Sequence, residues 1–97
     1  MKPEIVFAPG EIIKDEIEAR GWTQTQFAKI LGRPYQVVNG ILNGKREITP
    51  ESALQIAAAL GTSAEIWVRM EAEYRLHLAE QNFRSTDEIS ERALRAS

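Results

Sequence analysis

Residues that stop and start helices recur along this chain at intervals of roughly one short helix. Gly21, Gly32, Gly44 and Gly61 each follow a stretch with apolar residues at helical spacing. Residues that favour a first helical turn then open the next stretch, as Thr49-Pro50-Glu51 does. In a chain of 97 residues, this punctuation predicts an all-α bundle of five or six helices joined by short links.

The expected elements divide the chain into three parts. Residues 1–8 are an N-terminal extended segment with a β-like stretch, residues 9–81 a five-helix domain, and residues 82–97 a C-terminal helical tail. The tail has few apolar residues and no stop signal, so it is either a flexible end or the point where a longer protein was cut. We expect helices over residues 9–20, 23–31, 33–43, 49–60, 63–81 and 85–96.

Polar residues at two helix starts have the spacing of a capping box. In this arrangement a Thr or Ser side chain and a Gln or Glu side chain satisfy each other's backbone N–H groups. Thr23 with Gln26 and Thr62 with Glu65 have this spacing. Pro34 is expected in the first turn of the third helix, where its missing N–H does no harm.

The second and third helices have the residue spacing of a helix-turn-helix. Ala28 lies four residues before Gly32, and Val38 and Ile41 lie six and nine residues after it. A small alanine lets the helices approach closely, and glycine permits the positive φ of a short turn. Phe27 and Leu31 are expected to pack against Val38 and Ile41 from the other helix. The open alternative is a plain αα-hairpin with a glycine link.

The distribution of charge supports DNA binding although the net charge is −2. Residues 20–46 contain five basic residues and no acid, whereas residues 1–19 and 47–97 each carry a net negative charge. Phosphate contacts need local rather than global positive charge. The alternative is chance clustering of bases on a solvated face.

Helical geometry sorts the third helix into two faces. Val37, Val38, Ile41 and Leu42 are expected to face the core, with Val37 at the boundary. The other face is expected to enter the DNA major groove, where Gln and Asn can each contact adenine through two hydrogen bonds. A glycine within a helix indicates close approach of either a base pair or a neighbouring helix. The candidate base-reading residues are Tyr35, Gln36, Asn39, Gly40 and Asn43.

Phosphate contacts are expected from two places around that face. The N-terminus of the second helix offers free N–H groups and a favourable dipole. Basic residues flank the third helix on both sides. The candidate phosphate-binding residues are Thr23, Gln24, Thr25, Arg33, Lys45 and Arg46.

Four stretches of the chain resemble the HigA antitoxin group of lambda-repressor-like (Xre-type) regulators. They are residues 8–16 (APGEIIKDE), 21–24 (GWTQ), 41–51 (ILNGKREITPE) and 60–67 (LGTSAEIW). The resemblance covers residues 5–80, except that Pro34 and Gly40 depart from the common pattern. It implies a lambda-repressor-like five-helix fold and a dimer that binds a palindromic operator in double-stranded DNA and represses its own operon. It also implies a RelE-like toxin partner, an mRNA endonuclease that the chain neutralises.

An enzyme, a membrane protein and a secreted protein are not expected. Cysteine is absent, His77 is the only histidine, and no Gly-rich phosphate loop or metal-ligand cluster occurs, so we expect no catalytic site, cofactor or metal. Carboxylates such as Glu71 alternate with bases such as Arg75, which indicates a solvated face with i,i+4 pairs. The most apolar stretch, residues 53–64, is too short to span a bilayer, and no signal peptide opens the chain. A cytoplasmic location is therefore expected.

Part of an apolar stripe on the fifth helix is expected to form a homodimer interface. Trp67, Met70, Tyr74 and Leu78 recur every three to four residues, and a domain this small has little room for the whole stripe. Trp67 is assigned to the core, and Met70, Tyr74 and Leu78 to the dimer interface.

Three alternatives to this function stay open. The chain could be a regulator without a toxin, or the N-terminal module of a longer regulator with a metallopeptidase-like domain. It could also bind a toxin without contacting DNA. The extended segment at residues 4–7 could add to a sheet edge of a partner or form a strap over the bundle.

Overall fold

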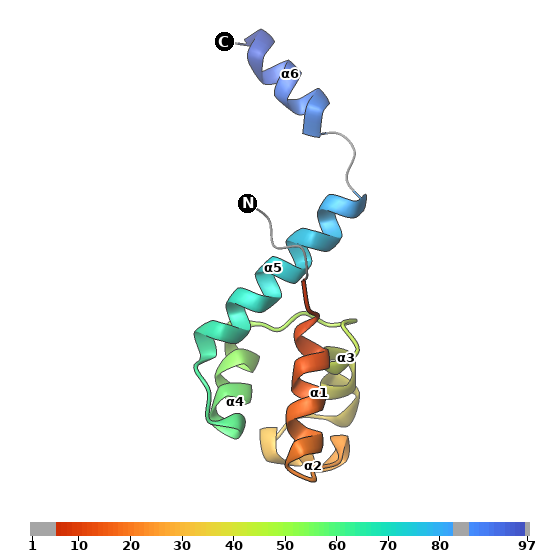
Figure 1. Ribbon diagram of the computed structural model, residues 1–97, viewed down its shortest axis with the longest axis vertical. Helices are drawn as coiled ribbons and strands as arrows, with labels where there is room; N and C mark the ends of the chain where they lie inside the picture. The colour runs from red at the N-terminus through yellow and green to blue at the C-terminus, as the bar shows by residue number, and fades with distance from the viewer. Residues whose placement is uncertain (1–5, 83–85, 97) are drawn as a thin grey trace.

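The computed structural model describes residues 6–82 and 86–96, and every regular element within these ranges is a helix. Helices α1 to α5 pack together, and α6 lies beyond the C-terminal end of α5, away from the others (Figure 1). The expected all-α bundle is therefore confirmed. The helices are α1 (Pro9–Ala19), α2 (Gln24–Leu31), α3 (Tyr35–Leu42), α4 (Pro50–Leu60), α5 (Ala64–Asn82) and α6 (Thr86–Ala96).

The ends of α2 follow the expected local chemistry. Thr23 accepts a hydrogen bond from the Gln26 N–H, and the Gln26 side chain accepts one from the Thr23 N–H, which confirms the capping box. Gly32 ends the helix with φ of 70°, a left-handed conformation that side chains disfavour. The short turn to α3 therefore depends on this glycine.

Two expected helix starts differ in detail from the structure. Pro34 precedes α3 as its N-cap residue, because its extended backbone places its carbonyl to accept the N–H groups of Val37 and Val38. The expected Thr62 capping box is wrong. The Thr62 hydroxyl instead accepts a hydrogen bond from the Trp67 indole at 2.7 Å, and Ser63 accepts the Glu65 N–H.

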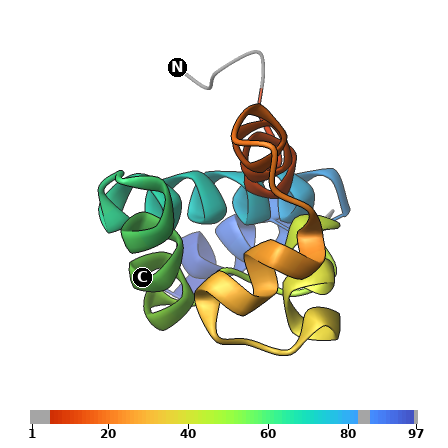
Figure 2. The ribbon, with the colours of Figure 1, turned by 90° about the horizontal axis from the view of Figure 1, so that it is seen from below.

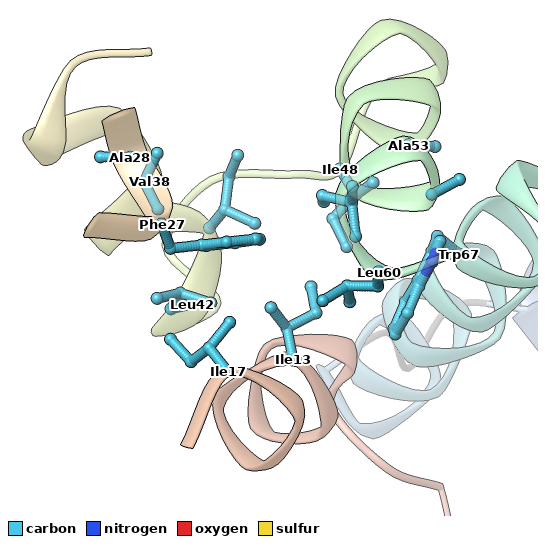
Figure 3. Close-up of a cluster of buried hydrophobic side chains, with 13 residues drawn as sticks. Ile13, Ile17, Phe27, Ala28, Val38, Leu42, Ile48, Ala53, Leu60 and Trp67 are labelled. Carbon is cyan, nitrogen blue, oxygen red and sulfur yellow. The ribbon is translucent and has the colours of Figure 1, made fainter. Parts of the chain in front are cut away.

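The core lies where α1 to α5 meet, and the buried side chains come from all five helices (Figure 3). Phe27 of α2, Val38 of α3 and Ile13 of α1 are each no more than 1% exposed. Ala28 is also buried, as expected for the close approach of α2 and α3. Trp67 of α5 closes the cluster at its other end, which confirms its assignment to the core.

The N-terminal segment forms no strand where the structure describes it. Val6 to Ala8 lead irregularly into α1, and within the described ranges no other strand is available to pair with them. The part of the expected β-like stretch at residue 5, with residues 1–4, lies outside the described residues. Phe7 is 63% exposed, so it is not part of the core.

The start of α1 lies against the end of α3 with no space for a side chain at Gly10. A Cβ atom built on Gly10 would lie 2.2 Å from the Leu42 carbonyl oxygen and 2.8 Å from that of Ile41. Both atoms belong to the backbone, so neither can rotate away. Gly10 therefore sets the distance between α1 and the end of α3.

We expect Gly10→Ala to destabilise the protein by about 1–3 kcal/mol, because the added methyl group forces α1 away from α3. Gly40→Ala is the matched control, since its Cβ would meet the flexible Arg46 side chain at 2.9 Å rather than a carbonyl. Urea denaturation of both variants measures the two costs. A Gly10→Ala variant that is as stable as the wild type would contradict the close approach.

Candidate nucleic-acid interface

Helix α3 has one buried and one polar side, as its sequence predicts. Val38, Ile41 and Leu42 are buried, and Val37 packs at the edge of the core. The other side has exposed Tyr35 and Gln36, half-buried Asn39 and, just after the helix, exposed Asn43. Figure 2 shows α2 and α3 next to each other across their short turn. This pairing leaves the polar side of α3 on the outside of the bundle.

A chain of side-chain amides joins the two helices on this side. The Asn39 amide donates to the Gln24 carbonyl oxygen at 3.1 Å, and the Asn43 amide donates to the Asn39 carbonyl oxygen at 3.2 Å. With its oxygen occupied, Gln24 has its NH₂ group as the donor for an outside acceptor. All three residues were predicted to contact DNA, but their mutual hydrogen bonds were not expected.

The N-terminus of α2 provides several donors close to this amide chain. Exposed Thr23 uses its side-chain oxygen for the cap, and its hydroxyl hydrogen is available to an outside acceptor. The N–H groups of Gln24 and Thr25 are at the first turn, where an α-helix offers them no partner. Such a helix end binds anions, phosphate included.

The loop after α3, residues 43–48 and hereafter the basic loop, carries exposed Lys45 and Arg46. Their backbone N–H groups donate to the Gly40 carbonyl oxygen at 2.9 and 3.1 Å. The loop therefore begins as a fixed continuation of α3. Its two exposed cationic residues therefore follow directly on that helix.

Gly40 has a partner in the structure that its sequence pattern did not predict. Gly40 is buried, and a Cβ atom there would meet the Cγ and Cδ atoms of Arg46 at 2.9 Å. The Arg46 side chain therefore lies over Gly40, in place of the base pair or neighbouring helix expected. Gly40 is not part of the exposed set formed by Tyr35, Gln36 and Asn43.

Two arginines of the basic window have partners within the bundle. Arg33, a candidate phosphate contact, donates to the Gln55 side-chain oxygen of α4 at 3.1 Å. Arg20 pairs with Glu16 at 2.6 Å and donates to the Leu60 carbonyl oxygen at 3.0 Å. The basic loop carries two exposed cations, Lys45 and Arg46, followed by one exposed acid, Glu47.

The residues expected at a dimer interface are partly covered within one chain. Met70 packs against the core, and Tyr74 and Leu78 are half-buried. The most exposed large apolar side chains of α5 are Leu76 at 60%, Ile66 at 46% and Val68 at 41%. Leu76 and Val68 lie on another face, whereas Ile66 lies one turn before Met70.

The expectation that Glu71 and Arg75 form a solvated pair is wrong in one respect. The pair exists, with Arg75 Nε 3.5 Å from Glu71 Oε1, but Glu71 is only 7% exposed. It is buried because it follows Trp67 by four residues and so shares the inner face of α5. That spacing was the sequence signal that could have revealed it.

The described residues contain few other candidate sites. Within residues 6–82 and 86–96, no three His, Cys, Asp or Glu side chains are placed to hold a metal ion. None of the described helices is long and apolar enough to cross a membrane.

Comparison with known proteins identifies the family of the chain. The helix-turn-helix family model HTH_3 matches residues 13–67, which is more than half of the chain. Virulence-associated protein I of Dichelobacter nodosus is 33% identical over 82 residues, which cover 84% of this chain and 76% of that protein.

Solved structures with the same fold include antitoxins. An addiction-module antidote protein of the HigA family from Coxiella burnetii is 34% identical with a TM-score of 0.76, covering 94% of this chain and 95% of that one. Pseudomonas aeruginosa antitoxin HigA, solved with the higBA promoter, is 27% identical with a TM-score of 0.77 and covers 88% and 91% of the two chains. The chain therefore belongs to the Xre-type helix-turn-helix family and is a DNA-binding regulator of the antitoxin type.

Proposed function

We propose that this chain binds its own promoter as a sequence-specific repressor and neutralises a RelE-like mRNA-cleaving toxin. The observation that carries the DNA-binding half is the joined surface of α2, α3 and the basic loop. It combines base-reading side chains, free helix N–H groups and cations in one place. The similar HigA antitoxin of Pseudomonas aeruginosa was solved with the higBA promoter, which supports promoter binding by this chain.

The polar side of α3 reads base edges, and the surrounding groups hold the phosphates. Exposed Gln36 provides the donor and acceptor pair that recognises adenine in the major groove. Asn39, which is already bonded to Gln24 and Asn43, contributes its second N–H and the second lone pair of its oxygen. Thr23, Gln24 and Thr25 bind one phosphate at the start of α2, and Lys45 and Arg46 bind phosphates beyond α3. Substitutions in the base-reading group should therefore reduce sequence preference, whereas substitutions in the phosphate-binding group should reduce affinity for all sequences.

We expect Gln36→Ala to weaken operator binding by about 1–3 kcal/mol and to relax the preference at one base position. Asn39→Ala also removes the partner of Gln24 and Asn43, so it should reduce the operator-binding free energy by at least as much. Lys45→Ala should instead weaken binding to all sequences and lower the salt slope by about one. Fluorescence anisotropy with the upstream DNA and a scrambled duplex, over a salt series, measures these effects. Unchanged operator affinity in Gln36→Ala would contradict the groove assignment.

The proposed DNA-bound form is a homodimer. Helix-turn-helix proteins bind two half-sites about one helical turn apart, and a two-fold protein matches that symmetry. The interface is assigned to Met70, Tyr74 and Leu78, whose stripe continues past the core along α5. A partner helix would cover the half-buried apolar surface that these side chains leave.

We expect Leu78→Glu to convert the dimer to monomers, because the carboxylate would be buried without a partner. Leu76→Glu is the matched control, since Leu76 is 60% exposed on another face of the same helix. Light scattering at high micromolar concentration measures both masses. A wild-type protein of monomer mass, or monomers only in Leu76→Glu, would contradict the interface.

The toxin partner is tested by expressing the short reading frame beside the gene, alone and together with this chain. We expect growth arrest and loss of translation from the neighbour alone, and relief when this chain is present. Gln36→Ala combined with Lys45→Ala, expressed from an unrelated promoter, is the control. Relief by this variant attributes the rescue to toxin binding rather than to repression.

The outcomes also separate the two other candidate functions. No arrest, with salt-dependent binding to the upstream DNA, would favour a regulator without a toxin. Relief of arrest without any binding to that DNA would favour a toxin-binding module. The HigA-family antidote protein of Coxiella burnetii, which this chain resembles over nearly its full length, supports the antitoxin.

A further inference from the structure

Two side chains of α5 hold the backbone of the basic loop. Glu71 Oε2 accepts a hydrogen bond from the Ile48 N–H. Arg75 Nη2 donates to the carbonyl oxygens of Gly44 at 3.1 Å and Arg46 at 3.2 Å. Every second residue from Gly44 to Ile48 is thus attached to α5 through its backbone.

The two side chains also bind each other. Arg75 Nε is 3.5 Å from Glu71 Oε1, and the guanidinium carbon is 5.4 Å from the centre of the Tyr74 ring. The Glu71 carboxylate therefore has both a charged neighbour and a backbone donor, as a buried charge requires. Tyr74 also lies beside Gly44, where an added Cβ would be 3.6 Å from its hydroxyl oxygen.

The basic loop is therefore held from two sides. The Gly40 carbonyl of α3 accepts from Lys45 and Arg46, and α5 holds the loop through Glu71 and Arg75. The side chains of Lys45 and Arg46 extend from a backbone whose position is set by both helices. This arrangement fixes where two cations lie relative to the base-reading side of α3.

We propose that Glu71 and Arg75 are positioning residues for DNA binding, which place Lys45 and Arg46 in register with α3. The proposal rests on the proposed function of the α3 surface. A loop without these attachments would have to be ordered at each binding event, and that ordering reduces affinity. Phosphate contacts and base contacts would then no longer form together at their full strength.

We expect Arg75→Ala to weaken operator binding about ten-fold and to lower the salt slope by about one, as if a phosphate contact were lost. Arg69→Ala is the control, because it removes the same charge from an exposed position of α5. Its affinity should stay within about two-fold of the wild type. Anisotropy titrations over a salt series, with thermal melts to establish the folded fraction, give both quantities.

A double-mutant cycle tests whether Arg75 acts through the loop. In a Lys45→Ala background, Arg75→Ala should cost clearly less than in the wild type, because one of the contacts that it positions is already absent. Glu71→Gln keeps an acceptor for the Ile48 N–H, so it should bind operator more tightly than Glu71→Ala. Additive effects of Lys45→Ala and Arg75→Ala would overturn the proposal.

Failure of this proposal differs from failure of the proposed function. If the wild type shows no salt-dependent binding to the upstream DNA, the proposed function is wrong. If the wild type binds and Arg75→Ala behaves as Arg69→Ala does, the positioning role is wrong. A lower melting temperature with unchanged affinity and salt slope would also overturn it, because it would assign Arg75 to stability alone.

Discussion

The packing of α3 against α2 and α1 is the contact on which the rest of the structure depends. Phe27, Ala28 and Val38 join the two helices, and Gly10 lets α1 approach the end of α3. Burying one side of α3 forces its polar side outward, because a short amphipathic helix has no other arrangement that buries its apolar residues. The candidate DNA surface is therefore a direct consequence of how the core is filled.

Electrostatics at this surface is local and depends on how the folded chain uses its arginines. The side chains of Arg20 and Arg33 are held by partners in the bundle, whereas Lys45 and Arg46 are exposed on the basic loop that follows α3. A net charge of −2 is compatible with binding a polyanion, because phosphate contacts depend on local positive charge and the repulsion from acids more than a Debye length away is largely screened by salt. The attachment of the basic loop to α5 gives these few cations a defined position.

The helices and the face of α3 could be predicted from sequence because they follow from local rules. Periodic apolar residues, the Thr23 capping box and the glycine at position 32 each act within a few neighbours, and the structure has them as expected. The expectations for Thr62, Gly40 and Glu71 failed or were incomplete for a common reason. Their partners are the Trp67 indole, the Arg46 side chain and the Ile48 N–H, respectively. Each of these contacts forms only because a turn or loop folds back onto a helix.

Helical spacing alone does not predict long-range contacts of this kind. Ile48 and Glu71 are 23 positions apart with the whole of α4 between them, and no pattern along the chain indicates that this carboxylate reaches that N–H. The inner position of Glu71 could have been predicted from its spacing of four residues after Trp67 in the sequence. Its partner could not have been.

The most direct test of the account is an NMR titration of the ¹⁵N-labelled chain with a duplex containing its upstream DNA. The account predicts that the largest amide shifts fall on three segments, namely residues 23–25, 35–39 and 43–48, with little change in α6. Shifts concentrated on α4 or α6, or no shifts at low salt, would contradict the claim that α2, α3 and the basic loop form the DNA-binding surface.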